Sequence, residues 1–132
     1  MTVRDLFDDD LEWDDMFPSM TFYEYEEAAM DSAIYDHELI YPVLGLLSEA
    51  GEVADKVKKI MRDEEIEVID PILDLNADQR KAIALELSDV LWYVTATAAD
   101  LGYGLDEIAS MNIDKLQSRK RRGRIKGSGD YR

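Results

Sequence analysis

Two pairs of acidic residues in the chain have a type and a spacing suited to binding metal ions. Glu49 and Glu52 are three residues apart, and Glu86 and Asp89 repeat that spacing. Each residue of a helix turns by about 100° and rises about 1.5 Å, so the members of each pair share one helix face. The sequence has no cysteine and one histidine, which excludes thiolate and multi-histidine sites. A metal site here must be built mainly from oxygen, and such a site suits Mg²⁺ or Mn²⁺.

The apolar residues around both acidic pairs recur at helical spacing. They are Leu46, Ala50, Val53, Val57 and Met61 in the first segment, and Ile83, Leu87, Val90, Val94 and Ala98 in the second. Each apolar stripe is offset from its acidic pair in the same direction, by roughly 90°. If the two helices pack stripe to stripe and antiparallel, equal offsets fall on the same side, and the four carboxylates converge. The connection of about a dozen residues between the helices favours antiparallel neighbours.

Three other interpretations of these acids are weighed against a magnesium site. Acidic residues at i and i+3 usually lie on a solvated helix face. Two such motifs with matched offsets argue against this interpretation more strongly than a single motif does. A ferritin-like di-iron site needs Glu-x-x-His pairs, and the residue three positions before His37 is Ile34, which excludes it. A non-catalytic acidic helical module that binds a partner stays open as the alternative from a different class.

Signals for helix starts precede three of the apolar segments. They are the capping pair Thr21 and Glu24, the first-turn Pro42, and the capping pair Asn76 and Gln79. A fourth periodic segment begins at Leu105, after Gly102 and Gly104. The sequence therefore predicts an all-α fold with helices at about 22–36, 42–62 and 77–101 and from 105 into the basic segment, and a possible strand at 66–69.

Charge is distributed unevenly along the chain. Residues 1–112 hold 28 acidic and 7 basic residues, whereas residues 113–132 hold 2 acidic and 8 basic residues. An acidic body repels nucleic-acid polymers, so none is expected as a partner. We expect an acidic, aromatic arm at 1–18, one domain at 19–123 and a basic, glycine-containing tail at 124–132. The sequence shows neither a long apolar run nor a secretory leader, so we expect a cytoplasmic protein with no membrane association.

Two glycines interrupt the second predicted helix. Gly45 and Gly51 each cost a helix about 1 kcal/mol relative to alanine. We interpret them as places where a neighbour or ligand approaches closely, with ordinary packing as an equal alternative.

Three segments together resemble the MazG-type all-α nucleoside triphosphate pyrophosphohydrolases, especially the small phage-encoded members. They are GLLSEAGEVADKVKK (45–59), ELSDVLWY (86–93) and NIDKLQSRKRRG (112–123). The resemblance implies a four-helix bundle of the all-α pyrophosphatase type that assembles as a homo-oligomer, a tetramer or a dimer, in the host cytoplasm if the protein is phage-encoded. It also implies Mg²⁺-dependent cleavage of a (deoxy)nucleoside triphosphate between the α and β phosphates, which gives the monophosphate and pyrophosphate.

The resemblance also implies roles for individual residues. Glu49, Glu52, Glu86 and Asp89 would hold the metal, and one of them, or the metal, would activate the attacking water. The implied substrate-binding residues are Asn112, Lys115, Tyr93, Trp92, Lys56, Lys59 and Arg119, of which the first two would contact the triphosphate. A narrower specificity, such as a dUTP, dCTP or phosphoribosyl-ATP pyrophosphatase, stays open.

Overall fold

The computed structural model describes residues 19–63 and 75–123. Four helices form in these residues, α2 (Phe22–Asp31), α3 (Ile40–Asp63), α4 (Ala77–Asp100) and α5 (Leu105–Arg121), and the described ranges contain no strand. The predicted all-α fold is therefore confirmed. The arm at 1–18, the possible strand at 66–69 and the tail at 124–132 lie outside the described residues.

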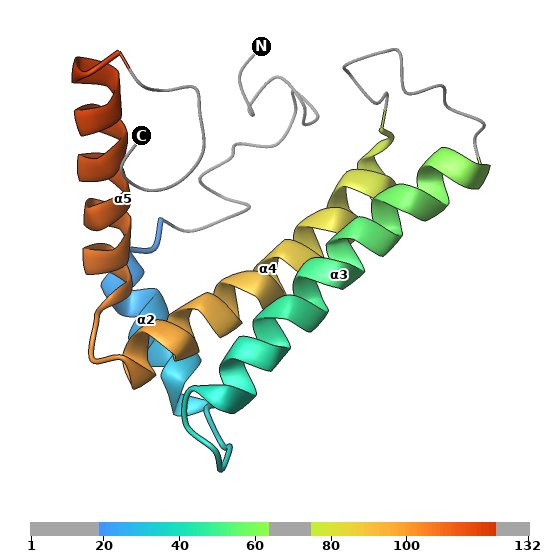
Figure 1. Cartoon of the computed structure of the whole chain (residues 1–132). Coiled ribbons are helices and arrows are strands. Elements are labelled where there is room, and N and C mark those ends of the chain that lie inside the picture. Colours follow the sequence, from blue (N-terminus) through green and yellow to red (C-terminus); the bar gives the residue numbers. More distant parts are fainter. Residues whose placement is uncertain (1–18, 64–74, 124–132) are drawn as a thin grey trace.

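The long helices α3 and α4 lie side by side and run in opposite directions (Figure 1). The predicted antiparallel pairing is thus confirmed. Pro42 is in the first turn of α3 and is almost fully buried, where its missing N–H removes no helical hydrogen bond. The Asn76–Gln79 capping box begins α4 through reciprocal hydrogen bonds, each 2.9 Å long.

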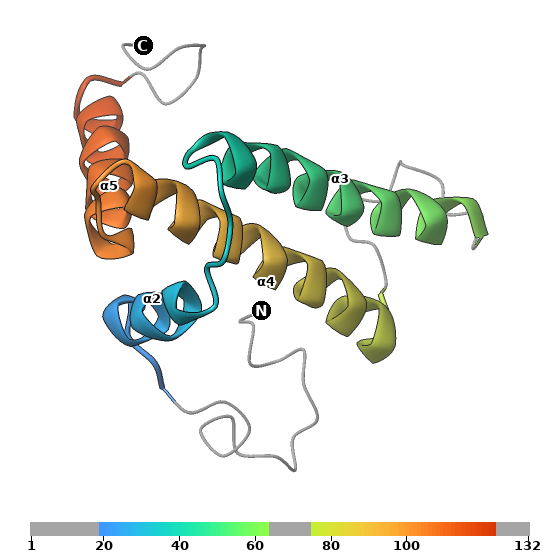
Figure 2. The same ribbon diagram turned by 90° about the horizontal axis from the view of Figure 1, so that it is seen from below.

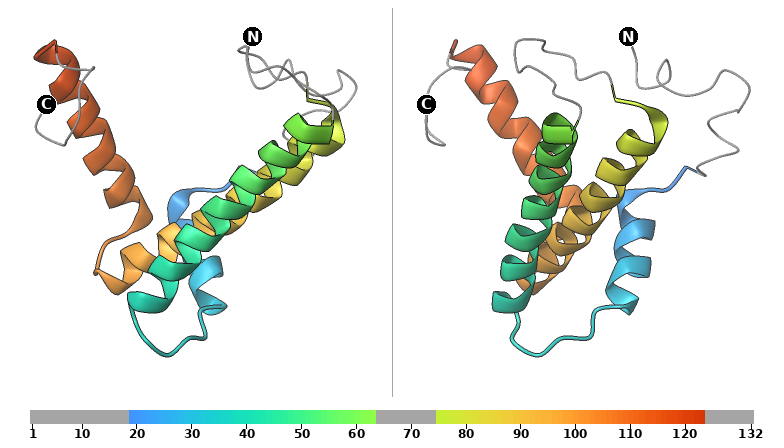
Figure 3. Two further views of the ribbon diagram at one scale, coloured as in Figure 1. Left: turned by 45° about the vertical axis from the view of Figure 1, so that its right-hand side comes forward. Right: turned by 90° about the vertical axis from the view of Figure 1, so that its right-hand side faces the viewer.

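The central element is α4, because α2, α3 and α5 all pack against it. Seen from below, α3 and α2 lie on opposite sides of α4 (Figure 2). The start of α5 is tied to α2, since the Leu105 N–H donates to a carboxylate oxygen of Glu26 at 3.1 Å. The carboxyl half of α5 then leans away from the α3–α4 pair (Figure 3).

The first helix is shorter than predicted: α2 ends at Asp31, not near residue 36. The hydroxyl of Ser32 donates to the Ala29 carbonyl at 2.7 Å, and the indole N–H of Trp92 reaches both groups at 3.1 Å. Both side chains thus donate to the Ala29 carbonyl at the end of α2, which also accepts from the backbone N–H of Ser32 at 3.2 Å.

A carboxylate at the end of α4 holds the connection between α2 and α3. Asp100 accepts hydrogen bonds from the Tyr35 hydroxyl at 2.9 Å and from the Leu39 N–H at 2.6 Å. Leu39 has a φ of 63°, a left-handed conformation that costs a non-glycine residue about 1–2 kcal/mol. The hydrogen bond to Asp100 offsets part of that cost.

Few side chains are buried completely, even though the helices are rich in apolar residues. The buried apolar residues of the described ranges are small or near helix ends: Ala29, Pro42, Ala96, Ala98 and Leu105. The predicted stripe residues Val53 and Val90 are only half-buried, and Leu87 is 51% exposed. One chain therefore leaves much of its apolar surface uncovered.

By length and composition, α4 is the one helix of the described residues that could cross a membrane. Helices at the centre of soluble proteins can have the same length and apolar composition. Here three other helices pack against α4. It also carries Glu86 and Asp89 near its middle, and carboxylates at the centre of a bilayer are costly. We therefore interpret α4 as the core helix of the domain.

Candidate metal and nucleotide site

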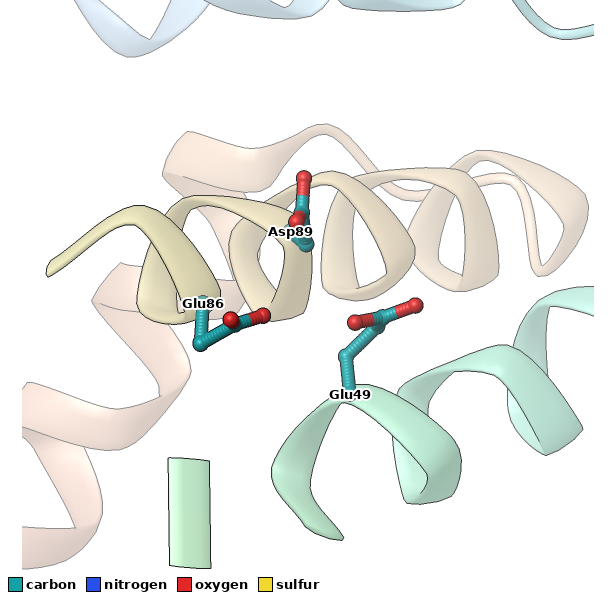
Figure 4. Close-up of side chains that lie close together, drawn as sticks. All are labelled: Glu49, Glu86 and Asp89. Carbon is teal, nitrogen blue, oxygen red and sulfur yellow. The ribbon is translucent and has the colours of Figure 1, made fainter. Parts of the chain in front are cut away.

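Three of the four predicted metal ligands converge between α3 and α4. Glu49, Glu86 and Asp89 each place one carboxylate oxygen so that all three oxygens lie within 4.8 Å of one another. Figure 4 shows Glu49 reaching from α3 toward the two acids of α4. We call these residues the acid cluster. Its donors are all oxygen, the chemistry that Mg²⁺ and Mn²⁺ prefer.

The surroundings of Glu49 disfavour its charged form. Partial burial raises the pKa of this carboxyl group, and the negative charges of Asp89, Glu86 and Glu52 raise it further. Acids placed this close repel one another unless a cation or a proton compensates them. The donor set and its electrostatics therefore fit a divalent cation.

The fourth predicted ligand, Glu52, lies at the edge of the acid cluster and is not one of the three converging residues. Its side chain is exposed, one short turn beyond Glu49 on α3. Its negative charge still acts on the carboxyl group of Glu49. Glu52 is thus close enough to influence the cluster from the solvent side.

The two lysines of α3 that were predicted to bind substrate have different partners in the structure. Lys56 reaches across to α4, where its ammonium lies 3.3 Å from a carboxylate oxygen of Glu86. Lys59 instead pairs with Asp55 on its own helix, and so does Lys58. Hydrogen bonding to Asp55 is the main cause that raises the pKa of Lys59. Lys56 is therefore the lysine that belongs to the acid cluster.

Tyr93 borders the acid cluster and lies over Gly45. A Cβ added at Gly45 would overlap the Tyr93 ring, so the glycine allows α4 to place a large aromatic ring against α3. The centroids of the Tyr41 and Tyr93 rings are 6.3 Å apart. A hydrogen bond with Tyr41 is the first cause of the raised pKa of Tyr93, followed by burial and by negative charges that include Glu49 and Asp89.

Trp92 has a different position. Its ring packs edge-on against Tyr93 with centroids 5.0 Å apart, but its indole N–H is used at the end of α2. Of the two aromatic residues predicted to border the nucleotide, the placement favours Tyr93. Trp92 anchors α2 to α4.

The residues predicted on α5 are not brought to the acid cluster of the same chain. Asn112 and Lys115 are exposed and Arg119 is half-buried. All three lie in the part of α5 that leans away from α3 and α4 (Figure 3). Their contacts with substrate stay a prediction.

Tyr41 is a neighbour of the site that was not predicted. Its spacing could have identified it, because Tyr41, Gly45 and Glu49 follow one another at intervals of four residues on one face of α3. Of the two alternatives given for Gly45 and Gly51, close approach by a neighbour applies at Gly45, where the neighbour is the Tyr93 ring, but not at Gly51, where no atom lies near enough to contact an added Cβ.

Comparisons with known proteins identify the family of this chain. The family model of the MazG nucleotide pyrophosphohydrolase domain matches residues 37–123, which include α3, α4 and α5. The Gene 37 protein of Mycobacterium phage L5 is 45% identical over 116 residues, a match that covers 82% of this chain and 96% of that protein. Among solved structures, none matches the chain. The chain belongs to the MazG nucleotide pyrophosphohydrolase family.

Proposed function

We propose that this protein hydrolyses (deoxy)nucleoside triphosphates between the α and β phosphates in a Mg²⁺-dependent reaction. The observation that carries the proposal is the convergence of Glu49, Glu86 and Asp89 from two antiparallel helices. Family membership supports nucleotide pyrophosphohydrolysis as the reaction class. The purely oxygen donor set supports Mg²⁺, with Mn²⁺ as a substitute.

Glu49, Glu86 and Asp89 would hold the cation, with Glu52 at the edge of the site. A bound ion would neutralise charge on the phosphoryl oxygens. Water would form a new bond to phosphorus while the bond from that phosphorus to the oxygen that bridges the α and β phosphates breaks, which gives a nucleoside monophosphate and pyrophosphate. A carboxylate of the site, Glu52 or a member of the acid cluster, or the ion itself would activate the attacking water, and such a carboxylate would accept its proton. Tyr93 borders the nucleotide, and Lys56 supplies positive charge beside Glu86.

We also propose that the working protein is a homo-oligomer, a tetramer in preference to a dimer. Leu44 and Leu47 on α3 are 62% and 67% exposed, and contiguous apolar surface of this kind is typical of subunit interfaces. Assembly would also allow α5 of one subunit to bring Asn112 and Lys115 to the acid cluster of another. Mixing Glu86→Gln protein with Lys115→Ala protein tests this, because shared sites regain turnover in mixed oligomers whereas sites within one chain do not.

The activity is tested by incubating purified protein with each dNTP and NTP in Mg²⁺ and separating the products. We expect monophosphate and pyrophosphate. Nucleoside diphosphate as product, or no turnover of any nucleotide with Mg²⁺ or Mn²⁺, contradicts the proposal. The panel also separates a broad enzyme from one specific for dUTP, dCTP or phosphoribosyl-ATP, provided the last compound is included.

Asp89→Asn removes a ligand without removing volume and is expected to reduce kcat/KM by at least about 100-fold. Its matched control is Asp78→Asn, the same change at an exposed position in the first turn of α4. Circular dichroism should show both variants folded. Equal activity of the two variants would favour a non-catalytic helical module or a site elsewhere.

A further inference from the structure

The basic residues in the second half of α3 are divided between two kinds of partner. Lys58 and Lys59 pair with Asp55, and Arg62 pairs with Asp63, all within the helix. Lys56 alone among these four pairs with the opposite helix, at Glu86. Of these four basic residues, Lys56 is therefore the one that places its positive charge at the acid cluster.

The contact between Lys56 and Glu86 is also partly shielded from solvent. The side chain of Glu86 is 19% exposed and that of Lys56 is 40% exposed. The carboxylate that Lys56 contacts is the one that converges with those of Glu49 and Asp89 (Figure 4). An ammonium and a divalent cation that use the same carboxylate oxygens compete, because each interacts through its positive charge.

We propose that Lys56 is a positioning residue that occupies the Glu86 carboxylate until a divalent cation displaces it and then turns toward the phosphates of the substrate. The inference rests on the proposed metal site at the acid cluster. Its reasoning is electrostatic: Lys56 compensates part of the repulsion among the three acids in the metal-free protein. After displacement, the flexible lysine side chain stays beside the site as a mobile positive charge.

The proposal predicts that removing the Lys56 ammonium strengthens the binding of Mn²⁺ and weakens the binding of pyrophosphate. Lys56→Met keeps most of the side-chain volume and removes the competing charge. Mn²⁺ should bind this variant about three- to fivefold more tightly than it binds the natural protein when no nucleotide is present. Pyrophosphate, added with saturating Mn²⁺, should bind the variant about three- to tenfold more weakly, because the ammonium that would contact it is absent. Both constants can be measured by isothermal titration calorimetry on the full chain.

Lys58→Met is the matched control, because it removes the same charge from the same helix but leaves the Lys56–Glu86 contact intact. We expect its two dissociation constants to stay within about twofold of those of the natural protein. If Lys56→Met and Lys58→Met change Mn²⁺ affinity equally, or if Lys56→Met weakens Mn²⁺ binding, the inference is wrong while the metal site stands. If no protein in the series binds Mn²⁺, the proposed site fails and the inference fails with it.

Discussion

The missing side chain at Gly45 lets the Tyr93 ring lie against α3 at the border of the acid cluster. Tyr93 cannot move aside freely, because Tyr41 and Trp92 lie against its ring. Gly45→Ala should therefore lower the free energy of unfolding by about 1–3 kcal/mol through overpacking. It should also reduce kcat/KM as the ring shifts. Urea unfolding and nucleotide turnover measure the two effects.

Gly51→Ala provides the control for Gly45 within the same helix. An added Cβ at Gly51 contacts nothing within 4 Å, and alanine is the better helix former by about 1 kcal/mol. This change should raise the free energy of unfolding. A loss of stability at Gly51 equal to that at Gly45 would show that helix geometry, not the Tyr93 ring, decides both outcomes.

The raised pKa of Glu49 gives the stability of the metal-free protein a pH dependence at this residue. A carboxyl group whose pKa is higher in the folded than in the unfolded state stabilises the fold below the unfolded-state value, and this contribution is lost as pH rises through the folded-state pKa. Glu49→Gln should therefore raise the Tm at pH 7 in the presence of a chelator, with the gain disappearing near pH 4, while turnover is lost.

Thermal unfolding from pH 4 to pH 7 checks the prediction for Glu49. Glu38→Gln, the same change at an exposed residue outside the acid cluster, is the matched control. A Tm for Glu49→Gln that stays below that of the natural protein at neutral pH would mean that Glu49 stabilises the metal-free fold.

At the scale of the elements, Asp100 joins α4 to the connection between α2 and α3. Asp100→Ala removes the acceptor for both the Tyr35 hydroxyl and the Leu39 N–H. We expect a loss of about 1–3 kcal/mol in the free energy of unfolding, because the partly buried Tyr35 hydroxyl and the exposed Leu39 N–H both lose their acceptor. Tyr35→Phe removes one of these hydrogen bonds and should cost about 1 kcal/mol. Urea unfolding of both variants gives the comparison, and equal losses would contradict the role given to the Leu39 N–H.

For the whole molecule, the exposed apolar side chains of α3 predict assembly. Leu47→Glu places a charge on the proposed interface and should reduce the molar mass measured by light scattering after size-exclusion chromatography. Ala77→Glu adds the same charge at an exposed position in the first turn of α4 and should leave the molar mass unchanged. A natural protein that is monomeric, or a Leu47→Glu variant of unaltered mass, would contradict an interface at this face.

Local signals in the sequence determined the helices and the types of group in the site. The capping boxes at Thr21 and Asn76 act within one turn, and the spacing of Glu49 from Glu52 fixes their shared face through helix geometry alone. The end of α2 escaped prediction because it depends on Trp92, which is 60 residues away from Ser32 in the sequence.

Only the tertiary structure decided which side chains meet across the helices. It placed Lys56, and not Lys59, on Glu86, and it directed Tyr93 toward α3 while Trp92 anchors α2. It also turned α5 away from the acid cluster of its own chain (Figure 3). The physical reason is the distance along the sequence over which each interaction acts. A helix forms through interactions between residues close in the sequence, whereas the partner of a long side chain depends on which charged or aromatic group of the opposite helix lies within its reach.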